Sequence, residues 1–409
     1  MRLLVADKID RGPLADLEIL GVEVVHDPAL TADGLIGALD DVDILVVRST
    51  RVPKEAIERS PSLSLIIRAG AGVNTIDLAT ASKHGVYVAN CPGKNAAAVA
   101  ELTMGLVLAL DRRIVDATIA LREGRWEKAE YQTAAGLYGK RIGIAGLGEI
   151  GRRVAKRARA FGMVVYAWSR SLTARRASDE GIRHCGSLRE LASSVDILSL
   201  HLPLDETTNG IVDREVLDAM PEDGMLINTA RAEILDYEAL AAVMGPKRLR
   251  VGLDVYQDEP KAGSARDFLP PVVQQAAASE GALLYGTPHI AASTAQAQRA
   301  ISREVVRIVR DFMTEVEVPN VVNVCRNTPA RWALVLRSRD EVGVLANVLN
   351  VIKRHGLNIE EITNTVFDGA SAACTKLRLT GRPGENCLNE IRAFDEVFHV
   401  DVVQLPNLA

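Results

Sequence analysis

The chain has 409 residues, of which 48% are hydrophobic and 25% charged, and its formal net charge is −5 at pH 7. Such a length predicts two or three domains with a sizeable apolar core, and the mixed charges exclude the basic face of a nucleic-acid-binding protein. The sequence contains neither an apolar run of about 20 residues nor a signal-peptide pattern, so we expect no membrane-spanning helix and no secretion.

Short apolar runs alternate with helical patterns over the first 90 residues. This alternation predicts a parallel sheet that is covered by helices on both faces. Strands are predicted at residues 2–8, 22–27, 42–49, 63–70 and 86–90, and helices at 12–20, 31–41, 53–60 and 76–85, with Thr31 as a helix N-cap.

A long apolar helix is predicted at residues 95–124, and it leads into a second alternating block. The strands of this block are predicted at residues 141–146, 163–168, 195–202, 224–230 and 250–256. We expect the helix after Ser293 to return to the first block. The predicted core is therefore two doubly wound α/β lobes with a cleft between them, formed by residues 1–95 with 291–316 and by residues 96–290.

A third unit follows a segment rich in prolines and asparagines, which predicts a linker at residues 317–330. Residues 331–409 then read as strand, helix, strand, strand, helix and strand, the βαββαβ order of a ferredoxin-like domain. The five cysteines of the chain are scattered and form no CxxC pair, so we expect no metal site and no disulfide framework. A reducing, cytoplasmic compartment is the corresponding expectation.

A glycine-rich turn lies between a predicted strand and a predicted helix of the second lobe. Gly146, Gly148 and Gly151 form a G-x-G-x-x-G pattern, which is weak alone but here stands in the strand–turn–helix context of a dinucleotide site. In this motif the first glycine permits a tight turn, the second lets a pyrophosphate approach the backbone, and the third lets the helix pack closely. The free N–H groups of the helix N-terminus favour phosphate.

The residue that normally distinguishes NAD from NADP stands at the end of the following strand. An acidic residue there would accept from the ribose hydroxyls of NAD, but this chain has Ser169, followed by Arg170. A serine does not repel a 2′-phosphate, and a guanidinium pairs well with one. The pair therefore favours NADP(H), while an Arg170 that is only solvated would leave NAD(H) equally acceptable.

Three charged side chains follow predicted strand ends in the second lobe: Arg231, Glu259 and His289. Ligands of open parallel sheets bind at the carboxyl ends of strands. Behind the glycine motif, this ordered set resembles the D-isomer-specific 2-hydroxyacid dehydrogenases over roughly residues 1–316. The resemblance implies a flavodoxin-like substrate-binding lobe, a Rossmann NAD(P)-binding lobe, and hydride transfer between a nicotinamide cofactor and a D-2-hydroxy acid.

The resemblance also implies roles for individual residues. His289 would exchange the hydroxyl proton, Glu259 would hold its other ring nitrogen, and Arg231 would grip the substrate carboxylate. The residues implied to bind the cofactor are Gly146, Gly148, Glu149, Ile150, Gly151, Ser169, Arg170, Leu202, Thr229, Ala230, Asp254 and Ala292.

Two further arginines near the N-terminus match the family pattern. By this resemblance Arg48 and Arg68 face the cleft, and the loop of Ala69, Gly70 and Ala71 cradles the substrate carboxylate with its N–H groups. Together with the arginine of the second lobe they exceed what a small monocarboxylate needs. A phosphate on the substrate would account for them, unless one of them pairs with a neighbouring acidic residue.

The segment "GRWE" at residues 124–127 is similar to phosphoglycerate dehydrogenases, and the C-terminal unit resembles an ACT domain. Such domains bind small amino acids at paired interfaces, which implies L-serine as an effector, or they serve only in dimerisation. Asn358 matches the serine-inhibited relatives, whereas Ser338 and Asp340 replace their histidine and asparagine. An effector site at these three positions is therefore one of two open readings.

The sequence departs from the family pattern near the cleft. Ala232 and Ala291 replace glycines after the implied catalytic arginine and histidine, and residues 260–288 form an unusually long segment. Such an insertion would reshape the substrate pocket or act as a lid. These departures concern the substrate and the cofactor rather than the class of reaction.

Three functions remain open. The leading hypothesis is oxidation of 3-phospho-D-glycerate to 3-phosphohydroxypyruvate, the first step of serine biosynthesis. The alternatives are an NADPH-linked glyoxylate or hydroxypyruvate reductase and, in another class, a nucleotide-sensing scaffold or corepressor. A homo-dimer or homo-tetramer is expected, because the long apolar helix at residues 96–110 and the edge strands of the C-terminal unit both suggest self-association.

Overall fold

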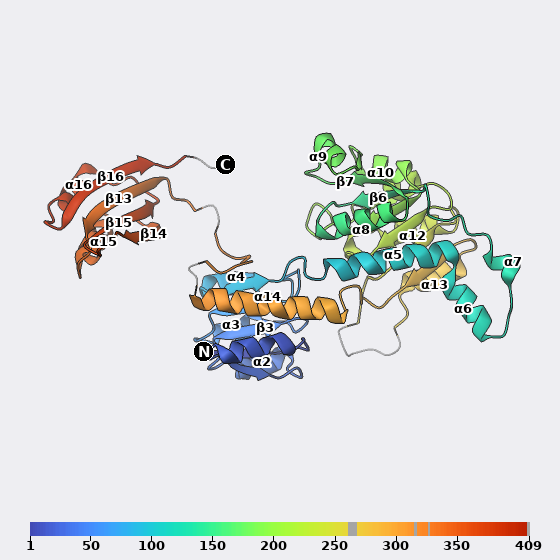
Figure 1. The fold of residues 1–409 in the computed structure, drawn as a ribbon, viewed down its shortest axis with the longest axis horizontal. Helices are drawn as coiled ribbons and strands as arrows, with labels where there is room; N and C mark the ends of the chain where they lie inside the picture. Colours follow the sequence, from blue (N-terminus) through green and yellow to red (C-terminus); the bar gives the residue numbers. More distant parts are fainter. Residues whose placement is uncertain (261–267, 315–316, 326–327, 407–409) are drawn as a thin grey trace. The chain divides into compact units, whose positions relative to one another are not determined.

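The computed structural model describes residues 1–260, 268–314, 317–325 and 328–406. Its contacts divide the chain into two compact units, Met1–Asn323 and Val324–Ala409 (Figure 1). The first unit contains two parallel sheets, and the second contains one antiparallel sheet. The predicted fold class, two α/β lobes followed by a ferredoxin-like domain, is confirmed.

The first lobe is a five-stranded parallel sheet with the flavodoxin-like strand order β2-β1-β3-β4-β5. Alternate strand residues enter two separate cores, because successive side chains of a strand point to opposite faces. Leu3 and Val5 lie in one core and Leu4 in the other. The elements are β1 (Arg2–Val5), η1 (Gly12–Leu14), α1 (Ala15–Ile19), β2 (Glu23–His26), α2 (Ala32–Ala38), β3 (Ile44–Val47), α3 (Lys54–Glu58), β4 (Leu65–Arg68), α4 (Leu78–Lys83) and β5 (Tyr87–Asn90).

Two later parts of the chain complete this lobe. Helix α14 (Ala295–Thr314) lies along it, and its Ile301, Val305 and Ile308 join the same core as Leu3 (Figure 1). Val321 then forms an antiparallel bridge with Ala89 of β5. The predicted linker at residues 317–330 therefore begins as part of the first lobe, because the backbone of residues 320–322 bonds to the sheet edge.

The second lobe is a seven-stranded parallel sheet with the order β12-β11-β10-β9-β6-β7-β8. This is the Rossmann order extended by β12 at one edge. Its strands are β6 (Arg141–Ala145), β7 (Val164–Trp168), β8 (Arg183–His184), β9 (Ile197–Leu200), β10 (Met225–Asn228), β11 (Arg250–Leu253) and β12 (Leu283–Gly286). Its remaining helices are α7 (Lys128–Tyr131), α8 (Glu149–Ala160), α9 (Ala174–Asp179), α10 (Leu188–Ser194), α11 (Arg214–Ala219), η2 (Ala232–Ile234), α12 (Tyr237–Met244) and α13 (Pro271–Ala278).

The prediction of a single helix at residues 95–124 is wrong, because the helix is interrupted at Arg113. Helix α5 (Ala96–Arg112) ends there, Arg113 adopts φ 47°, and α6 (Ile114–Arg122) begins. The guanidinium of Arg113 binds Asp116 at 3.2 Å and Glu130 at 2.6 Å, which holds the bend. The apolar side chains of α5 fill the core of the second lobe, so its composition no longer argues for self-association. Exposed apolar residues lie instead on α6, including Ile119 and Leu121.

The C-terminal unit has the predicted βαββαβ order. Its antiparallel sheet has the strand order β14-β15-β13-β16, and Leu334, Leu377 and Val400 of the sheet share a core with Val348 and Ile391 of the two helices. The elements are β13 (Trp332–Arg339), α15 (Val344–Arg354), β14 (Ile359–Val366), β15 (Ala372–Leu379), α16 (Glu385–Arg392) and β16 (Val397–Gln404).

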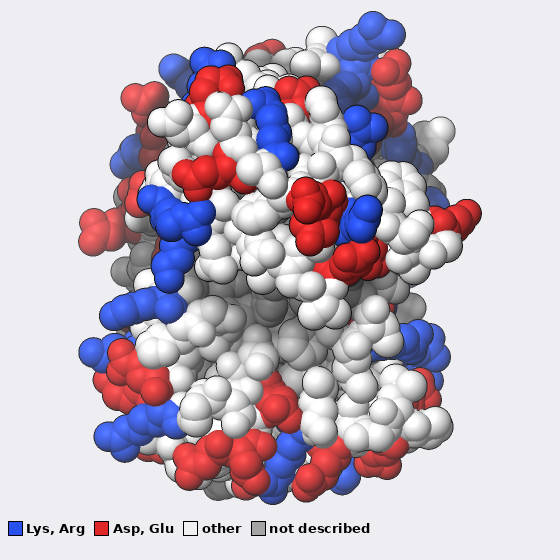
Figure 2. Space-filling view, turned by 90° about the vertical axis from the view of Figure 1, so that its left-hand side faces the viewer, with Lys and Arg blue, Asp and Glu red and all other residues white. Residues whose placement is uncertain are grey.

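Acidic and basic side chains are interspersed on the face drawn in Figure 2, where no continuous basic area gathers. Within the described ranges, no helix combines the length and apolar character needed to cross a membrane. The same residues contain no group of three or more His, Cys, Asp and Glu side chains arranged to hold a metal ion.

Glu304 on α14 joins three segments of the first unit. Its buried carboxylate accepts from Lys94 at 2.8 Å, from Arg307 at 2.7 Å and from Asn320 at 2.7 Å. Burial alone would raise the pKa of Glu304, but the hydrogen bonds from these three partners outweigh it and lower the pKa to about 2. The carboxylate therefore stabilises the folded state above the ordinary glutamate pKa, and this contribution is lost as the pH falls towards 2.

We predict that Glu304→Gln lowers the free energy of unfolding at pH 7 by about 1–3 kcal/mol, because hydrogen bonds to a charged group are lost. Urea unfolding at pH 7 and pH 4 measures the effect, and the deficit should shrink at the lower pH. Glu58→Gln on α3, which removes an exposed carboxylate of the same lobe, is the control. Equal stability of the two variants at pH 7 would contradict this role of Glu304.

Candidate active site

Arg231, Glu259 and His289 follow three adjacent strands of the second lobe, β10, β11 and β12. The carboxyl ends of parallel strands meet at one edge of the sheet, so these side chains are brought to the same place. Nδ1 of His289 lies 2.6 Å from Oε2 of Glu259. The charge of Arg231 acts on both residues of this pair. The structure thus brings the three predicted residues together.

The pair formed by Glu259 and His289 is electrostatically coupled. The hydrogen bond to Glu259 raises the pKa of His289 above its usual value, although partial burial opposes this. Burial tends to raise the pKa of Glu259, but the hydrogen bonds from His289 and from the Tyr256 N–H, at 2.8 Å, bring it below its usual value. Glu259 is therefore ionised and holds Nδ1 of His289 by a hydrogen bond, so the imidazole can exchange protons only through Nε2.

A buried carboxylate beneath the histidine loop sets its shape. Asp254 follows β11, and it accepts from the Thr287 hydroxyl at 2.6 Å and from the N–H groups of Ile290 and Ala291 at 2.8 and 2.9 Å. His289 between them has φ 51°, an unusual conformation for a non-glycine residue. Asp254, which the family resemblance implies as a cofactor contact, is thus placed where it positions the histidine loop.

Asn228 has the corresponding function for the arginine. It is the last residue of β10 and fully buried; its side chain accepts from the Ala230 N–H and donates to the Arg231 carbonyl, both at 3.0 Å. The Arg231 guanidinium donates to the Ala230 carbonyl at 2.6 Å. Sequence reasoning did not identify Asn228, although a polar residue that ends an apolar strand was a usable signal.

A cavity of about 730 Å³ opens beside these residues, within the first unit. Glu259 and His289 line it from the second lobe, and Arg48, Arg68 and Gly70 line it from the first. Asp7, which sequence reasoning missed, shapes the loop after β3 by accepting from the N–H groups of residues 48–50 at 2.7–3.0 Å. Ser293 was also missed, and its hydroxyl accepts from Arg48 at 3.3 Å.

The arginines around this cavity lack acidic partners. None of Arg48, Arg68 and Arg231 forms an ion pair with a carboxylate among the described residues. Burial, and then the charges of Arg231 and Arg48, lower the pKa of Arg68, and its buried Nε has no hydrogen-bond partner in the described structure. Among the described groups with the largest effects on the pKa of Arg68, the only carboxylate is Asp7, which raises it less than burial and the two arginines lower it. An anion between the three guanidinium groups would relieve their repulsion.

The glycine-rich turn has the geometry of a dinucleotide site. Gly146 has φ 95°, and a Cβ there would lie 2.5 Å from the His201 carbonyl oxygen. A Cβ on Gly151 would lie 2.1 Å from the Gly146 carbonyl oxygen, so close packing excludes any side chain. A Cβ on Gly148, the N-cap of α8, would meet no atom within 4 Å. The space in front of the helix N-terminus is therefore open, and the residues fit a bound pyrophosphate.

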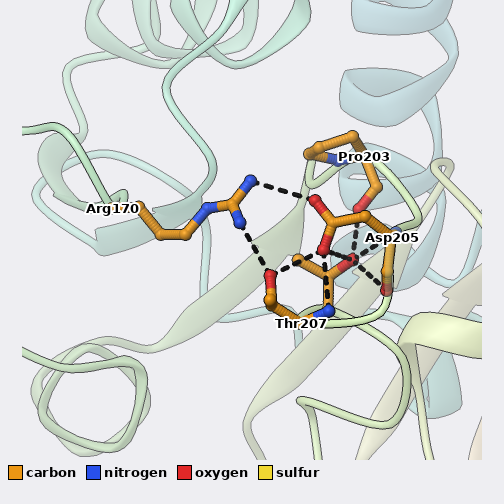
Figure 3. Close-up of polar contacts among 5 residues, drawn as sticks. Arg170, Pro203, Asp205 and Thr207 are labelled. Atoms are coloured by element: carbon orange, nitrogen blue, oxygen red, sulfur yellow. Dashed lines mark hydrogen bonds and ion pairs between the residues drawn. The ribbon is translucent and has the colours of Figure 1, made fainter. Parts of the chain in front are cut away.

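The other residues implied to bind the cofactor lie around this turn and the cavity. Leu202 contacts the Gly146 position, Thr229 is hydrogen-bonded to Thr103 on α5, and Ala292 lines the cavity. Ala230 is buried at the end of β10, and Glu149 and Ile150 begin α8. Ser169 and Arg170 follow β7, but the Arg170 guanidinium is bonded to Asp205 and Thr207 (Figure 3).

The three residues of the implied effector site do not meet within one C-terminal unit. Ser338 is buried near the end of β13, and Asp340 follows that strand. Asn358 precedes Ile359, which aligns through β15 with Trp332 at the opposite end of β13. At about 3.3 Å per residue, Asn358 lies about 20 Å from Ser338 along the sheet. A ligand that contacts both positions would need two copies of the unit.

Part of the long segment between Glu259 and His289 lies outside the described residues, at 261–267. Its described part contains Phe268 and Pro270, which line the cavity, and α13, which packs on α12 and β12. The insertion therefore contributes apolar wall to the cavity, while a lid function stays a prediction.

Comparisons with known proteins show which family the chain resembles. A family model described as the NAD-binding domain of D-isomer-specific 2-hydroxyacid dehydrogenases matches residues 104–291. The NAD⁺-bound 3-phosphoglycerate dehydrogenase of Entamoeba histolytica superposes with a TM-score of 0.64 at 26% identity, covering 79% of this chain and 99% of that one.

Sequence relatives extend the match. D-3-phosphoglycerate dehydrogenase of Methanocaldococcus jannaschii is 35% identical over 329 residues, which cover 78% of this chain but only 60% of that protein. Hydroxypyruvate reductase of Thermotoga maritima is 40% identical over 310 residues, covering 75% of this chain and 96% of that protein. Since nearly the whole of the Thermotoga protein is matched, the chain belongs to the family of D-isomer-specific 2-hydroxyacid dehydrogenases.

Proposed function

We propose that the chain is an oxidoreductase that interconverts a D-2-hydroxy acid and its 2-oxo acid with a nicotinamide dinucleotide. The observation that carries the proposal is the pairing of His289 with Glu259 in a cavity that Arg48 and Arg68 also line. Neither arginine forms an ion pair among the described residues, and the charge of Arg231 acts on Arg68 as well as on the histidine–glutamate pair. A proton-exchanging imidazole and a set of anion-binding groups are what this reaction requires.

In the oxidative direction, His289 takes the proton of the substrate hydroxyl on Nε2, and the carboxylate of Glu259 stabilises the resulting imidazolium. Arg231 binds the substrate carboxylate and polarises the carbonyl that forms. Asp254 and Asn228 hold the histidine loop and the arginine turn in place. The residues of the glycine-rich turn would hold a nicotinamide dinucleotide, which would supply the hydride acceptor when bound. In the reductive direction the same imidazolium donates its proton.

We propose 3-phospho-D-glycerate as the substrate, with 3-phosphohydroxypyruvate as the product. One guanidinium suffices for a monocarboxylate, so Arg48 and Arg68 are available for a second anionic group such as phosphate. The names of the Methanocaldococcus and Entamoeba relatives support this choice. The name of the Thermotoga relative supports the alternative, a glyoxylate or hydroxypyruvate reductase. A nucleotide-sensing scaffold is disfavoured, because a sensor has no use for the coupled histidine and glutamate.

The remaining roles are part of the same proposal. The residues around the glycine-rich turn bind NAD(H) or NADP(H), since Ser169 repels neither cofactor. The preference for NADP(H) expected from the sequence requires that Arg170 break its hydrogen bond with Asp205. A homo-oligomer is supported by the exposed apolar residues of α6. The C-terminal unit would act as an ACT domain, and L-serine at Ser338, Asp340 and Asn358 would require two copies. The cytoplasmic location stays a prediction.

Steady-state kinetics test the proposal directly. The full chain is assayed with 3-phospho-D-glycerate, and with 3-phosphohydroxypyruvate, hydroxypyruvate and glyoxylate, each with both nicotinamide cofactors. We expect the highest kcat/KM with the phosphorylated pair. A higher kcat/KM with hydroxypyruvate or glyoxylate would contradict 3-phospho-D-glycerate as the substrate. The absence of turnover with every acid would contradict the proposed enzymatic function.

Glu259→Gln should shift the pH dependence of both directions to lower pH. The hydrogen bond to Glu259 raises the pKa of His289, so its loss lowers that pKa. Oxidation needs neutral imidazole, and its rate therefore rises with pH at a lower midpoint in the variant. Reduction needs imidazolium, and its rate falls at a lower midpoint. Profiles of kcat/KM against pH measure the shift. Glu238→Gln on α12 is the control, and coincident midpoints in all three proteins would contradict the coupling.

Arg68→Gln should weaken binding of the phosphorylated substrate without destabilising the free protein. A charge-assisted hydrogen bond is worth about 1.5–3 kcal/mol, which corresponds to an increase in KM of roughly 10- to 100-fold. The thermal midpoint of the free variant should stay equal or rise, because burial and the neighbouring arginines already disfavour the charge at this position. Arg59→Gln, at the exposed end of α3, is the control. An unchanged KM, or a KM change accompanied by a lower midpoint, would contradict substrate contact.

A further inference from the structure

The two loops that flank the glycine-rich turn are joined by one side chain. In the sheet, β6 lies between β7 and β9, so the turn after β6 has the loop after β7 on one side and the loop after β9 on the other. Arg170 belongs to the first of these loops, and Asp205 and Thr207 belong to the second. Figure 3 shows the Arg170 side chain reaching across to them. The contact therefore lies where the adenosine half of a dinucleotide enters the groove.

Both ends of the Arg170 guanidinium are used in this contact. Nη2 donates to Oδ2 of Asp205 at 3.0 Å, and Nη1 donates to the Thr207 hydroxyl at 2.7 Å. The Thr207 hydroxyl in turn donates to Oδ1 of Asp205 at 2.6 Å. The three side chains thus form a closed set of hydrogen bonds, which we call the Arg170–Asp205–Thr207 bridge.

The acidic member of the bridge is held by its own loop. Oδ1 of Asp205 also accepts from the Thr207 N–H at 2.9 Å, and the Asp205 N–H donates to the Thr208 hydroxyl, itself bonded to the Pro203 carbonyl (Figure 3). The hydrogen bond from Thr207 lowers the pKa of Asp205, with smaller contributions from Arg170. Asp205 is therefore ionised at neutral pH, and its own loop holds it through hydrogen bonds that do not involve Arg170.

The bridge changes the charge that a 2′-phosphate would meet. Attraction by Arg170 is offset by Asp205, because the two charges are only 3.0 Å apart. If Arg170 binds a phosphate, the phosphate lies close to the carboxylate of Asp205, and the two negative charges repel each other. The end of β7 has no acidic residue, since Ser169 stands there, so Asp205 supplies from the opposite loop the negative charge that disfavours NADP.

We propose that Asp205 determines cofactor choice and makes the protein bind NAD(H) in preference to NADP(H). The inference rests on the proposed function only in that the glycine-rich turn binds a nicotinamide dinucleotide. It replaces the preference for NADP(H) that Ser169 and Arg170 suggested from the sequence, because that preference depended on an uncompensated guanidinium.

Binding of NADH and NADPH to the full chain, followed by the fluorescence of the reduced nicotinamide, tests the inference without any turnover. Wild type should bind NADH more tightly than NADPH. Asp205→Asn should shift the ratio of the two dissociation constants towards NADPH by about tenfold, the size of one close charge interaction partly screened by water. Adding Arg170→Gln to that variant should cancel the gain. Asp218→Asn, which breaks the exposed pair of Asp218 with Arg214 on α11, is the matched control and should leave the ratio unchanged.

Tighter binding of NADPH by wild type, or an Asp205→Asn ratio equal to that of Asp218→Asn, would overturn the inference, as would binding of neither cofactor. A shift that persists at 1 M NaCl would also count against it, because screening removes interactions between exposed charges. Dinucleotide binding with the expected ratios but no turnover of any hydroxy acid would contradict the proposed enzyme and leave the role of Asp205 supported.

Discussion

The hydrogen bond between Glu259 and His289 depends on the loop of the histidine, whose shape is held by the buried carboxylate of Asp254. Asp254 binds the backbone or side chain on both sides of the histidine, whose own φ is 51°. The strain of that conformation is offset by the charge-assisted hydrogen bonds to Asp254. The direction of the imidazole, its pKa and its access to the cavity all follow from the shape of this loop.

The arginines at and beside the cavity are arranged in a different way. Arg48, Arg68 and Arg231 are held close together without acidic partners among the described residues, so the protein retains their mutual repulsion. Sites of this kind are built for a ligand rather than for stability, because the missing counter-charge is supplied on binding. Arg48 and Arg68 come from the first lobe, whereas Arg231, Glu259 and His289 come from the second, and the chain crosses between the lobes at α5 and again before α14.

Much of the fold was predictable from the sequence, since alternating apolar runs and helices allow few other arrangements. Gly146, Gly148, Gly151, Arg231, Glu259 and His289 were also predictable, because they follow strand ends in a recognisable order. The break at Arg113 was not, because apolar periodicity continues through α6 and the bend is held by Glu130, 17 residues away. Asp7 and Asn228 were missed because they act on backbone groups. The pairing of Arg170 with Asp205 joins two loops 35 residues apart and leaves no local pattern.

The contact between Gly70 and Arg68 limits how this site can change by mutation. A Cβ on Gly70 would lie 1.7 Å from Nη1 of Arg68, so any side chain at position 70 must displace the guanidinium. The glycine is therefore tied to the arginine rather than to the conformation of its own backbone. If Arg68 were first replaced by a shorter residue, position 70 could accept a side chain. If Gly70 were replaced first, the new side chain would displace the guanidinium of Arg68 and weaken anion binding. The two positions are accordingly expected to vary together among descendants of a common ancestor.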